Sequence, residues 1–146
     1  MMSRALELAD LAAGEGEVPV GAVVYETETG RVLGEGRNGR ERERQPWQHA
    51  EFVAIQRACE SIGDWRLNHA SLAVTLEPCP MCAGLIVNAR VGRVIYGAAD
   101  PKAGAVDTLY ALLTDARLNH RCEVVAGVEA DASAERLRAF FSKLRG

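Results

Sequence analysis

The sequence predicts an α/β fold, in which a central sheet carries helices on both of its faces. Two observations favour this class. Short apolar runs alternate with segments in which apolar residues recur every three or four positions, as in amphipathic helices. Residues 71–98 give a strand, a helix and a second strand with short joints, which is typical of a parallel pair with a right-handed crossover. The 146 residues show neither repeats nor a linker, so we expect one domain over residues 1–146.

The first half of the chain predicts a helix, a hairpin and a second helix. Residues 3–13 place apolar side chains at helical spacing. The apolar runs 18–26 and 30–36 flank a polar turn, which is typical of a β-hairpin. Residues 37–48 alternate in charge and predict a solvated loop. A helix is expected over residues 49–62, because its apolar residues again fall on one face.

The second half predicts three strands separated by helices. Its apolar runs are short enough for buried strands, and the segments between them show the helical period. In chain order we expect a strand at 71–77, a helix at 80–90, a strand at 91–98, a loop and a helix within 100–120, a strand at 122–128 and a helix at 132–145.

Composition and charge limit the possible function classes. The net charge is −3 and the sequence pI is about 5.6, whereas a dedicated nucleic-acid binder usually has a strong basic excess. These values remain compatible with a small local basic patch. No apolar run reaches the roughly 18 residues that cross a bilayer, and the N-terminus lacks the pattern of a signal peptide. We therefore expect a cytoplasmic protein, not a membrane protein, whose four cysteines stay reduced and serve as ligands or in packing.

Three residues form a pattern that is typical of a metal site. His49 lies where one predicted helix begins, and Cys79 and Cys82 lie three apart where another begins. Residues three apart in a helical turn face the same way, so both sulfur atoms can point at one spot. The free N–H groups and the dipole at a helix start favour the thiolate form, which binds metals. One imidazole and two thiolates suit Zn²⁺.

The number of ligands separates a catalytic zinc site from a structural one, because a catalytic site leaves its fourth position to water. Cys59 follows His49 on the same predicted helix, about 15 Å further along its axis, so it cannot reach the same ion. Cys122 begins a strand near the end of the chain, and the sequence alone leaves it open as a fourth ligand. For both Cys59 and Cys122 we expect a place in the core.

Glu51 lies beside the predicted ligand His49 but has no place in a His–Cys–Cys ligand set. A carboxylate beside a catalytic zinc ion can take a proton from water and pass it on, because the ion lowers the pKa of water to about 7. The alternative is an exposed helix-start residue that the helix dipole favours. Beside a three-ligand site we expect Glu51 to be catalytic.

Residues 49–51 read HAE and residues 78–82 read PCPMC, and this pair of motifs resembles the cytidine/deoxycytidylate deaminase superfamily. The flanking segments narrow the resemblance to bacterial tRNA adenosine deaminases, in the same order and at similar spacing over nearly the whole chain. These segments read EVPVGAVV, GEGRN, WRL, VTLEPCPMCAGLI, GRVIYGA, DPKAGAV, LNHR and FFSKLR. The resemblance implies a three-layer cytidine-deaminase-like fold with a five-stranded mixed sheet, a homodimer, and hydrolytic conversion of adenosine to inosine at the wobble position of tRNA.

The resemblance also implies roles for single residues. His49, Cys79 and Cys82 match the zinc ligands of the family, and Glu51 matches its proton shuttle. Asn38 matches an asparagine that hydrogen-bonds the flipped nucleoside, although an ordinary turn residue is the alternative. The implied cofactor is Zn²⁺, and the implied partner is a tRNA anticodon loop.

Further substrate contacts follow from the same resemblance. Asp100 and Lys102 match a loop that touches the nucleotides beside the target. Phe140 and Phe141 match a terminal helix that helps to form the anticodon-loop surface, and packing in the core is an equal expectation for both.

Two segments depart from the family pattern. Residues 45–48 read Gln-Pro-Trp-Gln where the family usually reads Asp-Pro-Thr-Ala, and Ala99 replaces a commonly basic residue. Trp47 is predicted to contact the substrate, either as a stacking platform for an RNA base or as the wall of a smaller pocket. A deaminase of a free base or nucleoside, such as guanine or cytosine, is therefore the alternative function. A non-enzymatic module with a structural zinc is a remote alternative.

Overall fold

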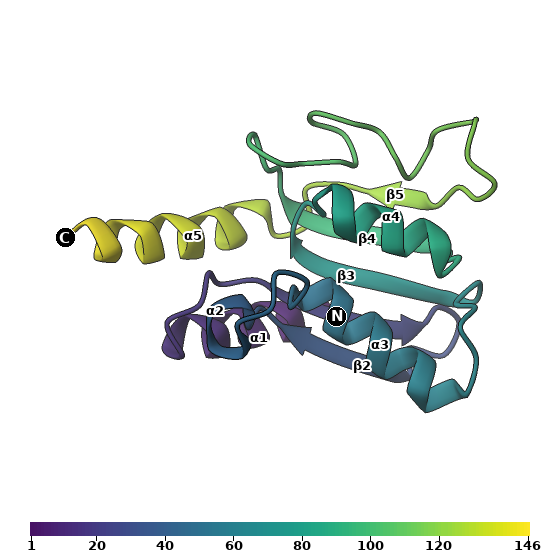
Figure 1. Ribbon diagram of the computed structural model, residues 1–146, viewed down its shortest axis with the longest axis horizontal. Helices are drawn as coiled ribbons and strands as arrows, with labels where there is room; N and C mark the ends of the chain where they lie inside the picture. Colours follow the sequence, from purple (N-terminus) through teal and green to yellow (C-terminus); the bar gives the residue numbers. More distant parts are fainter.

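The computed structural model describes all 146 residues and contains one five-stranded mixed sheet (Figure 1). Its strands are Gly21–Glu26 (β1), Val32–Arg37 (β2), Ala70–Leu76 (β3), Arg93–Ala98 (β4) and Glu123–Val125 (β5). They lie in the order β2-β1-β3-β4-β5. β1 runs antiparallel to β2 and β3, whereas β4 runs parallel to both β3 and β5. The expected hairpin and the expected parallel crossover are therefore confirmed.

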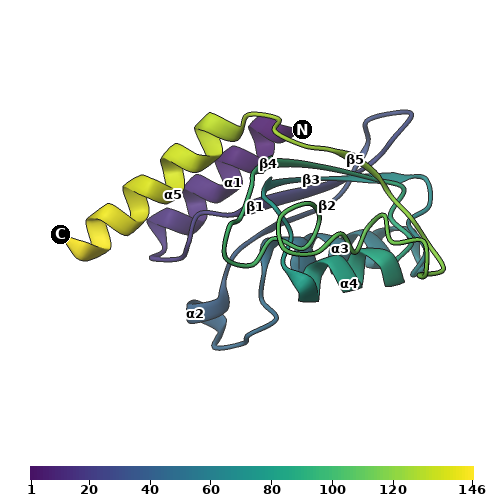
Figure 2. The same ribbon diagram turned by 90° about the horizontal axis from the view of Figure 1, so that it is seen from above.

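Helices cover both faces of the sheet, as the α/β class predicts. They are Met2–Gly14 (α1), Arg40–Glu43 (α2), Ala50–Ile62 (α3), Pro80–Asn88 (α4) and Ala130–Arg145 (α5). α1 and α5 lie on one face, and α3 and α4 lie on the other (Figure 2). α2 is a short turn of helix between β2 and α3, outside both layers. No helix combines the length and the apolar content that crossing a membrane requires.

Two glycines of β2 allow α3 to lie directly on the sheet. A Cβ atom at Gly34 would lie 2.3 Å from the carbonyl oxygen of Ala54, and one at Gly36 would lie 2.3 Å from that of Ala50. Only glycine permits this approach, because a Cβ atom would overlap the helix backbone. The contact fixes the start of α3, which carries the predicted site residue Glu51 in its first turn and His49 as its N-cap.

The main core lies between the sheet and the helices α3 and α4. It contains 23 buried residues, among them Leu72, Ile86 and Val94. Cys122 belongs to this core, as predicted, and Cys59 packs partly buried against it. The cluster under α1, on the opposite face, contains only 6 buried residues. The helices that carry the predicted ligands therefore stand on the larger of the two cores.

The segment between β4 and β5 corrects one prediction. The helix expected within residues 100–120 is absent, and the chain there forms turns and irregular structure. The backbone N–H groups of Val106, Asp107 and Thr108 donate to the side chain of Glu77, not to carbonyl groups one helical turn earlier. The apolar spacing that suggested a helix thus belongs to an irregular loop.

The last helix corrects a second prediction, the packing of Phe140 and Phe141 in the core. Ser133 is the one buried residue of α5, and the exposed fraction is 41% for Phe141 and 68% for Leu144. Phe140 is half-buried, and its ring packs edge-to-face on Phe141 with centroids 5.4 Å apart. The last turns of α5 project beyond the sheet (Figure 1), so its apolar residues there lie outside the core.

Candidate active site

The three predicted metal ligands project from the starts of α3 and α4. His49 is the N-cap residue of α3, and Cys79 is the N-cap residue of α4. Pro80 occupies the first turn of α4, where its missing N–H is not needed. The helical turn then places Cys82 on the same side as Cys79. β3 ends at Leu76, just before Cys79, so the group lies at the carboxyl end of this strand.

The ligand atoms of His49, Cys79 and Cys82 all lie within 4.8 Å of one another. The Nδ1 atom of His49 is 3.6 Å from each of the two sulfur atoms. Zinc–sulfur bonds of about 2.3 Å and zinc–nitrogen bonds of about 2.0 Å at tetrahedral angles place nitrogen and sulfur about 3.5 Å apart. The donor types and their spacing therefore fit a zinc ion. Neither Cys59 nor Cys122 belongs to the group, so Cys122 is not the fourth ligand.

The electrostatics of the group favour a thiolate at Cys79. The hydrogen bond from the Cys82 thiol lowers the pKa of Cys79 to about 4, and the side chain of His49 acts in the same direction. The pKa of Cys82 is raised, because its proton is shared with Cys79 and because its side chain is buried. A metal ion that binds both sulfur atoms as thiolates would release this shared proton.

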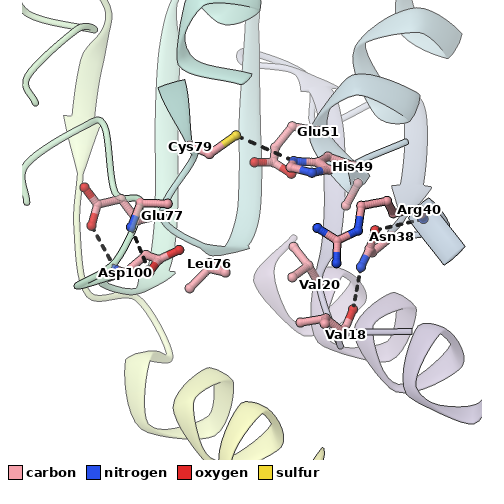
Figure 3. Close-up of a pocket in the computed structure, with 12 residues that line it drawn as sticks. Val18, Val20, Asn38, Arg40, His49, Glu51, Leu76, Glu77, Cys79 and Asp100 are labelled. Carbon is pink, nitrogen blue, oxygen red and sulfur yellow. Dashed lines mark hydrogen bonds between the residues drawn. The ribbon is translucent and has the colours of Figure 1, made fainter. Parts of the chain in front are cut away.

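Glu51 lies in the first turn of α3, with its side chain against the same group. The residue is 4% exposed, and Figure 3 shows its carboxylate beside the His49 ring. Burial raises the pKa of the Glu51 carboxyl to about 7, although its own backbone N–H and His49 oppose the shift. A carboxyl that titrates near neutral pH can accept and donate a proton in turn. The alternative of an exposed helix-start residue is therefore wrong.

His49, Glu51 and Cys79 line the end of a cavity with a volume of about 170 Å³ (Figure 3). Val18, Val20 and other apolar side chains supply half of its lining residues, and a few polar groups converge on it. This combination is typical of sites for small organic molecules. The cavity is smaller than the roughly 300–1,000 Å³ of typical ligand sites, which suits a single heterocyclic base.

Two of the four predicted substrate-binding residues line this cavity. On one side, the Nδ2 atom of Asn38 donates to a backbone carbonyl at 3.2 Å, and its Oδ1 accepts from the N–H of Arg40. On the opposite side, the Oδ1 atom of Asp100 accepts from the N–H of Lys102 at 3.0 Å. Lys102 is exposed outside the cavity, and Trp47, which is 45% exposed, is not among the lining residues either.

Two buried glutamates that sequence reasoning missed hold the walls of the cavity. Glu17 is 1% exposed and accepts the backbone N–H groups of Glu41 and Arg42, each at 2.9 Å. Glu77 is 2% exposed and accepts four backbone N–H groups from the loop after β4. The available signal for Glu77 was its position, since it directly follows a buried strand and precedes Pro78.

The fold and the site together define a class, that of metal-dependent hydrolases. A metal ion held by these three side chains would have one coordination position left for water, and a buried carboxylate lies beside them in a cavity for one ring. The model of the MafB19-like deaminase family matches residues 1–145. This match confirms the resemblance that the HAE and PCPMC motifs carried.

Curated relatives narrow the family further. The tRNA-specific adenosine deaminase of Bacillus subtilis (strain 168) is 46% identical over 144 residues, which cover 99% of this chain and 88% of the relative. The tRNA-specific adenosine deaminase of Haemophilus influenzae is 42% identical, over 99% of this chain and 83% of the relative. The chain therefore belongs to the deaminase family of the tRNA-specific adenosine deaminases.

Solved structures share the fold. A structure described as a tRNA:A34 deaminase that edits the wobble position of transfer RNA superposes with a TM-score of 0.88 at 41% identity, over 93% of this chain and 97% of the other. The expected three-layer fold is thereby confirmed. A guanine deaminase from Nitrosomonas europaea superposes with a TM-score of 0.85, over 97% of this chain and 82% of the other, but is only 22% identical. That second similarity concerns the fold alone.

Proposed function

We propose that the protein hydrolyses the exocyclic amine of adenosine at the wobble position of a tRNA anticodon, which yields inosine and ammonia. The observation that carries this proposal is the buried Glu51 beside the His49–Cys79–Cys82 group, at the end of a cavity for one base. The identity of 46% with a tRNA-specific adenosine deaminase along almost the whole chain supports this substrate class.

The cofactor that best fits the ligand group is Zn²⁺. Nδ1 of His49 and the sulfur atoms of Cys79 and Cys82 would hold it, because nitrogen and thiolate donors at this spacing suit a tetrahedral ion. A bound zinc ion supplies hydroxide at neutral pH, since it lowers the pKa of water to about 7. The remaining steps depend on the side chains of the protein.

Glu51 is the proposed carrier of protons. Water adds at C6 of adenine while Glu51 moves one proton from the water to N1. Glu51 then moves a second proton from the new C6 hydroxyl to the amine, the C6–N6 bond breaks, and ammonia leaves. Burial keeps bulk water away from the carboxylate and raises its pKa to about 7. Because this value is close to neutral pH, the carboxyl can both accept and donate a proton.

Asn38 and Asp100 are the proposed contacts to the nucleoside, because they line opposite sides of the cavity (Figure 3). Asn38 donates one Nδ2 proton to a backbone carbonyl and retains a second for the substrate. Asp100 uses its Oδ1 atom for the N–H groups of Lys102 and Ala103, which leaves Oδ2 for a substrate donor. Each side chain is thus held in place by the backbone.

The RNA around the target base is proposed to lie over α5. Lys102, Arg138 and Arg145 line a second hollow together with Phe141. Cations beside an exposed ring suit phosphates and unstacked bases, so this hollow is a local basic patch on an acidic chain. Trp47 stays a proposed stacking platform outside the cavity, since its side chain is exposed and is not among the lining residues.

A homodimer is proposed as well. Met81 on α4 is 40% exposed, and Leu109 and Tyr110 on the loop after β4 are 53% and 57% exposed. If these side chains form one contiguous patch in the folded protein, they would mark an association surface. Light scattering of the purified protein would measure the mass, and a monomer at every concentration would contradict this part of the proposal.

A tRNA substrate would place the protein in the cytoplasm.

The test is a deamination assay of zinc-loaded protein on an anticodon stem-loop with adenosine at the wobble position. Free guanine, cytosine, adenine and their nucleosides run in parallel, and Glu51→Gln serves as the blank. We expect inosine in the RNA and no ammonia from the free compounds. Ammonia from a free base with the RNA unchanged would overturn the tRNA substrate and support the free-base alternative.

A further inference from the structure

The carboxylate of Glu77 is surrounded by hydrogen-bond donors from one loop. Its Oε1 atom accepts the N–H of Asp100 at 3.0 Å and the hydroxyl of Thr108. Its Oε2 atom accepts the N–H groups of Val106, Asp107 and Thr108 at 3.1, 2.8 and 3.0 Å. These donors are 23 to 31 residues away in the sequence, so one buried side chain organises a distant segment.

The loop fits closely around this carboxylate. A Cβ atom at Gly104 would lie 2.4 Å from the carboxyl carbon of Glu77, which leaves no room for any other residue there. The N–H of Gly104 donates to the carbonyl of Asp100, and the N–H of Ala105 donates to the carbonyl of Pro78. The loop is therefore fixed both to Glu77 and to the chain directly after it.

Glu77 is also part of the cavity. Glu77, Asp100 and Ala103 are all lining residues, and Figure 3 shows Glu77 next to Asp100, across the cavity from Asn38. Its oxygen atoms already accept five hydrogen bonds, so the carboxylate has little capacity left to take a proton from the substrate. The arrangement suits a residue that shapes the wall and does not suit a proton carrier.

We propose that Glu77 is a positioning residue, which folds the loop of residues 100–108 into the wall that places Asp100 against the bound nucleoside. The inference rests on the proposed function, because the contact of Asp100 with the substrate belongs to that proposal. Glu77 acts on substrate affinity through Asp100 and takes no part in proton transfer.

The test compares Glu77→Gln and Gly104→Ala with the wild-type zinc-loaded protein. Glu77→Gln replaces one acceptor oxygen with a donor that opposes the backbone N–H groups, and Gly104→Ala pushes the loop away without removing charge. We expect both variants to raise KM for the anticodon stem-loop about tenfold and to keep kcat within about threefold. Glu123→Gln, an exposed residue of β5 outside the cavity, is the control and should match the wild type.

Amide hydrogen exchange gives a second readout that needs no activity. The exchange of the Val106, Asp107 and Thr108 amides should accelerate at least tenfold in Glu77→Gln. Unchanged exchange would overturn the proposal, as would faster exchange with KM and kcat both unchanged. A collapse of kcat at constant KM would overturn it too, because Glu77 would then act in the chemistry.

Failure of the proposed function can be distinguished from failure of this inference. If the wild-type protein deaminates a free base and not the RNA, the tRNA proposal fails. KM for that base, measured in Glu77→Gln and Gly104→Ala, then decides the role of Glu77 in the same way. A tenfold rise in KM would support the positioning role, and an unchanged KM would exclude it.

Discussion

The first wall of the cavity, residues 38–49, contains a helical turn, whereas the second wall, residues 100–108, contains no regular structure. Each wall is held by one buried glutamate that lies outside it in the sequence. Glu17 accepts two backbone N–H groups at the start of α2, a common way to satisfy the free donors of a helix end. Glu77 accepts four backbone N–H groups and a hydroxyl.

The difference shows how strongly each wall depends on its carboxylate. α2 can satisfy some of its backbone groups internally, because Glu43 donates its N–H to the carbonyl of Gly39 as in a helix. In the second wall, the N–H groups of Val106, Asp107 and Thr108 all donate to Glu77. The second wall should therefore lose more of its structure when its glutamate is changed.

The largest expected effect concerns the end of the cavity between the two walls. Glu51→Gln should reduce kcat by a factor of about 10²–10⁴ or more, because a general acid and base is lost from a buried position. Zinc content by elemental analysis should stay that of the wild type, since Glu51 is not part of the ligand group. Normal turnover by this variant would contradict the mechanism, and loss of zinc would make Glu51 a ligand.

The next largest effect is expected on the free energy of unfolding, which allows the two walls to be compared directly. Glu77→Gln should lower the free energy of unfolding by about 3 kcal/mol and Glu17→Gln by about 1–2 kcal/mol, because fewer buried donors lose their acceptor at Glu17. Urea unfolding of both variants measures this difference, with the exposed Glu28→Gln as the control. Equal losses would show that the number of donors does not determine how strongly a wall depends on its glutamate.

The same comparison explains how much of the site the sequence predicts. His49, Cys79 and Cys82 were predictable because each lies at a helix start and helical spacing is local. The sequence also predicted a catalytic role for Glu51 from its place beside them, whereas its burial became visible only in the structure. The loop of residues 100–108 was not predictable, since its donors pair with a side chain 23 or more residues away. Likewise, the helical period of α5 is visible in the sequence, but the absence of a covering layer over Phe141 is not.

Acid should weaken the second wall. Burial alone would raise the pKa of Glu77, but the hydrogen bonds from Asp107, Thr108 and Asp100 outweigh it and lower the pKa to about 2. A carboxyl with a lowered pKa stabilises the fold fully above its unfolded value, which is about 4.5, and this contribution is lost as the pH falls toward 2.

Unfolding of the wild type and Glu77→Gln at pH 7 and pH 3 tests this expectation, because glutamine does not titrate. The stability difference between the two proteins should be smaller at pH 3 than at pH 7. A difference that stays constant between these pH values would show that the charge of Glu77 does not contribute to holding the loop.

The smallest expected effect separates the walls by their charge. Lys102 on the second wall makes no ion pair, whereas Arg42 on the first pairs with Glu15 and with Glu43. A free cation displaces a counterion from RNA, while a cation already neutralised by carboxylates displaces less. Lys102→Ala should therefore reduce the slope of log Kd against log salt for an anticodon stem-loop by about 1, and Arg42→Ala should reduce it less. Fluorescence anisotropy over a salt series measures both slopes. Equal changes would mean that the RNA backbone follows both walls, and an unchanged slope for Lys102→Ala would remove Lys102 from the phosphate contacts.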